Sequence, residues 1–139
     1  MTAKEITGEL ERIVLKQDFA ACSAELVDVL SAAGAGIETI DPILRFMEDH
    51  PSINYGAPGA LVHFLERYYR KGYEEKLVDS VRRKPTRTTV WMLNRIINGT
   101  QIIEIKRQLI EVMEAINSNP LADQITLQQA KHFLERLIT

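Results

Sequence analysis

The sequence predicts an all-α fold of about eight short helices in a single domain that spans residues 1–139. Two observations support this prediction. Apolar residues recur at helical spacing along most of the chain, and no segment combines a sustained apolar–polar alternation with the hairpin dipeptides that would indicate strands. A segment that begins with proline and ends with glycine also occurs twice, at residues 58–72 and 85–99.

Each of these segments predicts one complete helix, because proline is tolerated in the first turn of a helix and glycine ends a helix in the left-handed conformation. Large apolar residues also correspond between the two segments: Phe64 with Trp91, Leu65 with Met92 and Tyr69 with Ile96. Like helices in succession predict stacked antiparallel pairs, as in HEAT and armadillo repeats. Such folds form binding surfaces more often than catalytic clefts.

Eight helices are expected in chain order, over residues of about 3–16, 18–33, 41–49, 58–71, 73–84, 86–98, 100–117 and from 126 onward. In most of them apolar residues at helical spacing share one face. Two pairs, Thr2 with Glu5 and Thr126 with Gln129, have the spacing of a capping box, which marks a helix start.

The other boundaries depend on single residues. Asp41 followed by Pro42 predicts an N-cap and the first helical position of the third helix. Thr100 predicts the cap of the seventh helix. Residues 50–59 contain prolines and glycines in turn-like order, so we expect the longest loop there.

Composition is typical of a soluble globular protein, with 45% hydrophobic and 26% charged residues. No segment approaches the length of apolar sequence that a membrane span needs, and the N-terminal residues lack the form of a secretory signal. We therefore expect a cytoplasmic protein with no membrane partner. The single cysteine, Cys22, excludes an internal disulfide.

Charge is unevenly distributed along the chain. Residues 1–50 have four Lys/Arg against ten Asp/Glu, which gives −6, and residues 51–99 have nine against four, which gives +5. Residues 100–139 have four against five, so the net charge of the whole chain is only −2. Segregated charge of this kind can steer a charged partner toward one patch.

No pattern of reactive residues predicts catalysis. The three histidines, His50, His63 and His132, are far apart, and none has a second histidine three or four residues away, so we expect no metal. No nucleophile motif is present, and the loop at residues 54–59 lacks the spacing of a phosphate-binding loop. We therefore expect neither an enzyme, nor a cofactor, nor a small-molecule substrate.

The basic stretch at residues 67–87 keeps a nucleic-acid-binding module open as an alternative, because Lys and Arg displace counterions from phosphates. Three nearby tyrosines, Tyr68, Tyr69 and Tyr73, have rings that can stack on bases. The pI of about 5.9 and the acidic residues within the stretch oppose this interpretation. A solvated face, or a patch for an acidic protein, is the competing interpretation.

Residues 55–99 resemble small helical immunity proteins of bacterial polymorphic toxin systems, including those of contact-dependent growth inhibition. The resemblance lies in GAPGALVHFLE at 56–66, GYEEKL at 72–77 and PTRTTVWMLNRI at 85–96, about a third of the chain. It implies a bacterial cytoplasmic protein that binds one cognate toxin domain and blocks it without catalysis. A general helical protein-interaction adaptor is the other alternative.

If the toxin is a nuclease with a basic cleft, the acidic N-terminal third could occupy that cleft in place of nucleic acid. The residues expected to contact the partner are Glu38, Asp41, Glu48, Asp49 and Tyr55. Of these, Tyr55 is expected to be exposed, because it lies in the long loop. The opposite polarity, in which the basic middle of the chain meets an acidic toxin surface, stays open.

Overall fold

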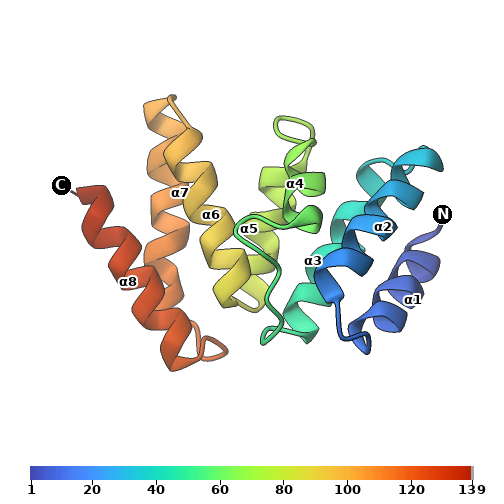
Figure 1. Ribbon diagram of the computed structural model, residues 1–139. Helices are drawn as coiled ribbons and strands as arrows, with labels where there is room; N and C mark the ends of the chain where they lie inside the picture. The colour runs from blue at the N-terminus through green and yellow to red at the C-terminus, as the bar shows by residue number, and fades with distance from the viewer. Residues whose placement is uncertain (139) are drawn as a thin grey trace. The chain divides into compact units, whose positions relative to one another are not determined.

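The computed structural model describes residues 1–138, which form eight α-helices and two short 3-10 helices without any strand. This confirms the all-α prediction and its number of helices. The α-helices are α1 (Ala3–Val14), α2 (Phe19–Ala32), α3 (Ile40–Asp49), α4 (Ala60–Glu66), α5 (Tyr73–Arg83), α6 (Arg87–Gly99), α7 (Ile103–Ala115) and α8 (Gln124–Ile138) (Figure 1). Within this part of the chain, no helix is long and apolar enough to cross a membrane.

The contacts divide the chain into two compact units, Met1–Lys76 and Leu77–Thr139. The boundary falls within the sequence of α5. Each unit has its own set of buried apolar side chains. The single domain over residues 1–139 stays a prediction.

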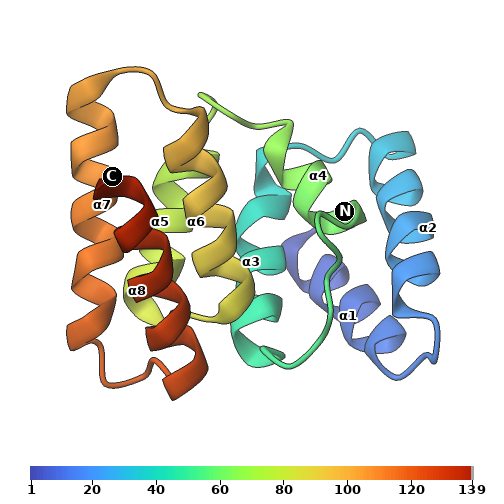
Figure 2. The same ribbon diagram turned by 60° about the vertical axis from the view of Figure 1, so that its left-hand side comes forward.

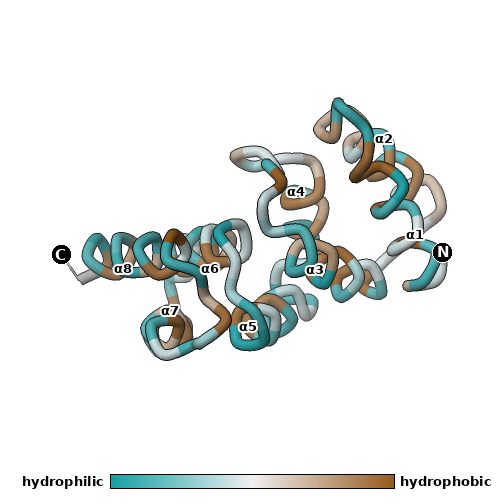
Figure 3. The backbone as a smooth tube through the Cα atoms, turned by 90° about the horizontal axis from the view of Figure 1, so that it is seen from below, coloured by the Kyte–Doolittle hydropathy of each residue, from teal (hydrophilic) through white to brown (hydrophobic). Residues whose placement is uncertain are grey.

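In the first unit, α1 packs on α2 and on α3, and α2 packs on α4. In a stack of antiparallel helix pairs, each helix contacts the next helix and the one after it. The observed contacts therefore agree with the predicted arrangement. The buried residues of α1 are Ile6, Leu10 and Ile13, whose spacing of four and three residues places them on one face. Apolar positions recur along the helices between hydrophilic ones (Figure 3).

In the second unit, α6, α7 and α8 contact one another and alternate in direction (Figures 1 and 2). Val90, Leu93 and Ile97 lie on the buried face of α6. Trp91 is half-buried, and the guanidinium of Arg95 lies 5.2 Å from the centre of its ring.

Only some of the helix caps that the sequence predicts are present in the structure. The capping box of Thr2 and Glu5 is present, with both reciprocal hydrogen bonds. The predicted cap at Asp41 is wrong: a 3-10 turn at Ile37–Thr39 precedes α3, so Thr39 takes the N-cap position and Asp41 lies in the first turn. Tertiary packing decides this boundary, because both Thr39 and Ile40 are buried.

The predicted caps of the last two helices are also wrong. Thr100 does not start α7; its hydroxyl donates to the carbonyl of Ile96 at 2.6 Å and closes the end of α6. The start of α8 is capped by Asp123, whose carboxylate accepts the N–H of Thr126 at 2.8 Å. Thr126 is therefore the third residue of the helix, and its side chain is buried.

The two proline-to-glycine segments do not form two like helices. The second forms the 13-residue helix α6, but Gly99 is its last helical residue and has no positive φ. The first forms only the seven-residue helix α4, followed by turns in which Arg70 and Gly72 have φ of 64° and 107°. Both oxygens of the Glu74 carboxylate accept the N–H of Arg70 at 3.0 Å, which holds the chain away from the helical path.

Candidate functional site

The predicted acidic residues are distributed along α3. Asp41 and Asp49 are exposed and eight residues apart, about 12 Å along the helix axis, and they share one face of α3. Asp41 pairs with Nζ of Lys76 at 3.0 Å. Glu38 precedes α3 and accepts the N–H of Gly36 at 2.8 Å, and this hydrogen bond holds the pKa of its carboxyl below the usual value.

Two predicted partner contacts lie in the interior of the first unit. Glu48 is 4% exposed, on the side of α3 that faces the core, and Tyr55 is 6% exposed. The expectation of an exposed Tyr55 is therefore wrong, and neither side chain is available to a partner at the surface. Glu48 is buried because α3 has seven buried residues out of ten, so only a narrow stripe of the helix reaches solvent. Tyr55 is buried because its ring packs against Phe19 and Phe46.

Tyr55 closes the core at the end of α3. Its hydroxyl donates to the carbonyl of His50 at 2.8 Å, and its ring lies edge-on to Phe19 at 5.7 Å and to Phe46 at 6.4 Å. Burial raises the pKa of the phenol, and the carboxylates of Glu11 and Asp49 raise it further. A polar side chain that is buried, hydrogen-bonded and packed against aromatic rings has a structural role.

Glu11 and His50 were not predicted from the sequence as part of this surface. Oε1 of Glu11, on α1, lies 2.9 Å from Nε2 of His50, and the His50 ring lies 4.5 Å from that of Phe46. Glu11 and His50 are 39 positions apart in the sequence, so there is no local signal for this contact. We use the term acidic surface for four exposed carboxylates: Glu11 on α1, Glu38 in the turn before α3, and Asp41 and Asp49 on α3. The exposed Arg45 lies between Asp41 and Asp49 on the same stripe of α3.

The basic stretch at residues 67–87 is shared between the two units. Tyr73 is fully buried, so it is not available to stack on a base. Tyr68 is half-buried and donates to the carbonyl of Ala35 at 3.2 Å. Of the three tyrosines, only Tyr69 is exposed, at 38%, and its hydroxyl donates to Glu66 at 3.0 Å. These contacts weaken the case for base stacking.

A groove of about 420 Å³ lies in the second unit, between the end of α5, the end of α7 and the loop before α8. We call it the basic groove, and its main lining residues are Val81, Arg82, Arg83, Val112, Ile116 and Leu121. Asn119 fixes its rim, because Nδ2 donates to the carbonyl of Arg82 at 3.0 Å and Oδ1 accepts the N–H of Leu121 at 2.9 Å.

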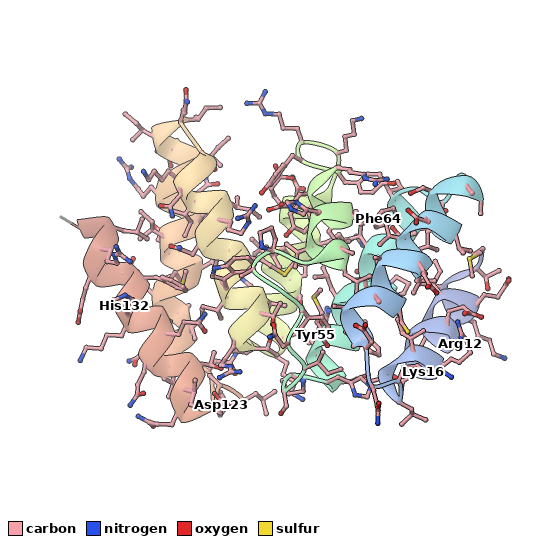
Figure 4. All side chains as sticks on the ribbon, viewed as in Figure 1. Arg12, Lys16, Tyr55, Phe64, Asp123 and His132 are labelled. Carbon is pink, nitrogen blue, oxygen red and sulfur yellow. The ribbon has the colours of Figure 1, made fainter. Side chains whose placement is uncertain are left out.

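The histidines are apart in the structure as in the sequence. Nδ1 of His63 lies 3.3 Å from Glu66, whereas His132 is exposed on α8 (Figure 4). No group of three His, Cys, Asp or Glu side chains within residues 1–138 is arranged to hold a metal ion.

The comparisons with known proteins give no relative: no protein-family model, curated protein or solved structure matches the chain. Function must therefore be inferred from the acidic surface, the basic groove and the resemblance of residues 55–99.

Proposed function

We propose that this protein is a bacterial cytoplasmic immunity protein, which binds one cognate toxin domain and blocks its active surface without catalysing a reaction. The resemblance of residues 55–99 to immunity proteins of contact-dependent growth inhibition suggests the class of partner. The acidic surface is the observation that carries the proposal, because it gives the first unit a means of recognising a basic protein cleft.

Charge supports this surface as the toxin-binding face. The first unit has eight Lys/Arg against thirteen Asp/Glu, which gives −5, and only Glu48 among those carboxylates is buried. A nuclease must present positive charge to its nucleic acid, so a protein surface with carboxylates can occupy the same cleft. Opposite charges also speed association, which favours rapid inhibition of a toxin that enters the cell.

The position of the carboxylates on α3 favours binding as well. Asp41 and Asp49 are attached to a helix whose other side is embedded in the core, so the backbone that carries them is already ordered before binding. Little conformational entropy is then lost when a partner docks. Asp41 is engaged in a surface ion pair with Lys76, and Glu11 lies within hydrogen-bond distance of His50; such exposed pairs cost little to break.

The test is co-expression with the toxin domain encoded by the adjacent reading frame. The wild-type protein should protect cells and co-purify with that domain. The double variant Asp41→Lys, Asp49→Lys should associate at least about tenfold more slowly at low salt, and the difference should shrink as salt screens the charges. Stopped-flow fluorescence of the purified pair measures these rates.

A matched control separates the acidic surface from net charge. Glu135 is exposed on α8 in the other unit, so Glu135→Lys alters charge away from the surface. Two such reversals on the second unit, Glu135→Lys with Glu114→Lys, give the same net charge as the double variant. Equal association rates for the two double variants would reject the acidic surface, and absence of protection by the wild type would reject the immunity function.

A further inference from the structure

The second unit has a binding surface of opposite character to the acidic surface. It has nine Lys/Arg against six Asp/Glu, which gives +3. Arg82 and Arg83 line the basic groove, and none of the described residues that line it has a carboxylate. The two charged side chains that line the groove are therefore both cations, and Arg82 is the exposed one.

The floor of the groove is apolar. Val81 of α5, Val112 of α7 and Ile116 of the 3-10 turn that follows α7 form it, and each is buried. Leu121 stands at the rim with 60% of its surface exposed. An apolar floor beside an exposed leucine offers a place for aliphatic or aromatic side chains of another molecule, because removing such surface from water is favourable.

The rim is held in place before any ligand binds. The side-chain amide of Asn119 bridges the carbonyl of Arg82 and the N–H of Leu121, so the loop before α8 is tied to the end of α5. Asn119 also accepts the N–H of Ala122 through its own carbonyl at 3.2 Å. A rim that is already ordered lowers the entropy cost of docking.

We propose that the basic groove binds an acidic amphipathic segment of another protein. Apolar side chains of the segment would enter the groove, and its Asp or Glu side chains would meet the exposed Arg82. A groove with exposed Arg82 and Leu121 at its edge does not enclose a small molecule, whereas a helix or extended segment covers such a groove. Nucleic acid fits less well: its phosphates would meet Arg82, but the valines and isoleucine of the floor provide no donors for base edges.

This inference goes beyond the proposed immunity function. The acidic surface selects a basic partner, and the basic groove selects an acidic one, so the two surfaces serve different partners or different segments. Each is tested by variants in its own unit.

The test uses the full chain and a fluorescein-labelled peptide of about 15 residues, with leucines at i, i+3, i+4 and i+7 and glutamates elsewhere. Fluorescence polarisation measures its binding at low salt. We expect binding that weakens with salt, and at least about tenfold weaker binding of a peptide in which lysine replaces every glutamate. Amide shifts in a ¹⁵N–¹H spectrum should concentrate at the lining residues.

Two surface variants test the two parts of the groove. Arg82→Glu removes a cation and Leu121→Asn removes the apolar rim, and each should weaken peptide binding at least about tenfold. Their matched controls are Lys131→Glu and Ile125→Asn, on exposed residues of α8 that do not line the groove. All four proteins should keep the wild-type helical circular dichroism, because the four residues are exposed.

Several results would overturn the proposal. Equal binding by Arg82→Glu and Lys131→Glu would show that only net charge matters. Tighter binding of a single-stranded oligonucleotide than of the acidic peptide would assign the groove to nucleic acid. Concentration-dependent dimerisation of the wild type that Leu121→Asn abolishes would assign it to a second copy of this chain.

Discussion

Replacement of Tyr55 distinguishes a core residue from a partner contact. In the structure the ring packs edge-on against the stacked pair of Phe19 and Phe46, and the hydroxyl donates to the carbonyl of His50. Tyr55→Ala removes the ring and leaves a cavity, so it should lower the free energy of unfolding by about 3–5 kcal/mol. Tyr55→Phe removes only the hydroxyl and its hydrogen bond, and it should cost about 1 kcal/mol.

Urea unfolding followed by far-UV circular dichroism measures both changes. The matched control is Tyr69→Ala, because Tyr69 is the same residue type in the same unit but is exposed. Its ring contacts that of Tyr73 at 5.5 Å, so a loss of at most about 1 kcal/mol is expected.

Either of two results would refute this reasoning. If Tyr55→Ala destabilises the protein no more than Tyr69→Ala does, Tyr55 is not part of the core. If Tyr55→Phe costs as much as Tyr55→Ala, the hydroxyl rather than ring packing dominates, and the assignment of the aromatic cluster as the stabilising element fails.

Three further predictions follow from local geometry. Gly8→Ala should stabilise the protein by about 0.5–1 kcal/mol, because Gly8 is helical and has open space around its Cα. Gly59→Ala should destabilise the protein, because a Cβ there would overlap the carbonyl oxygen of Tyr55. Thermal unfolding compares the two variants, and a stabilising Gly59→Ala would contradict the loop geometry. Asp123→Ala should cost about 1 kcal/mol near neutral pH. The N–H and hydroxyl of Thr126 hold the pKa of the Asp123 carboxyl below its usual value, so the capping stability is present above about pH 4 and is lost as pH falls. Asp123→Asn should keep a cap without that pH dependence. Urea midpoints measured across pH test this: a difference in midpoint between the wild type and Asp123→Ala that does not narrow in acid would contradict the prediction. Burial raises the pKa of the Tyr55 phenol above that of the unfolded chain, so its contribution to stability is complete below about pH 10 and declines at higher pH. The ultraviolet difference absorbance between the wild type and Tyr55→Phe isolates the ionisation of Tyr55, and ionisation centred at about pH 10 would refute the burial.

Local sequence patterns predicted the helical class and several helix starts. Thr2 and Glu5 form their capping box because both partners lie within one turn, and the apolar spacing of α1 gives Ile6, Leu10 and Ile13 one buried face. Such interactions depend on residues three or four positions apart, which the sequence shows directly.

The repeated proline-to-glycine segment predicted the structure less well. Residues 58–72 and 85–99 share apolar positions, yet Tyr69 is exposed and Ile96 is buried. The first segment leaves the helix after Glu66, with Arg70 in the left-handed region and its N–H held by the carboxylate of Glu74. A proline and a glycine mark where a helix can begin and end, but they do not decide whether the residues between them stay helical.

The sequence by itself determined the secondary structure class and the segregation of charge, because helical periodicity and side-chain charge are local properties. Only the tertiary structure decided which carboxylates share a surface: it brought Glu11 beside His50 and turned Glu48 into the core, next to an exposed Asp49. It also buried Tyr55 in a loop that looked exposed. Burial depends on segments that are distant along the chain packing against each other, and no spacing within a single helix records that packing.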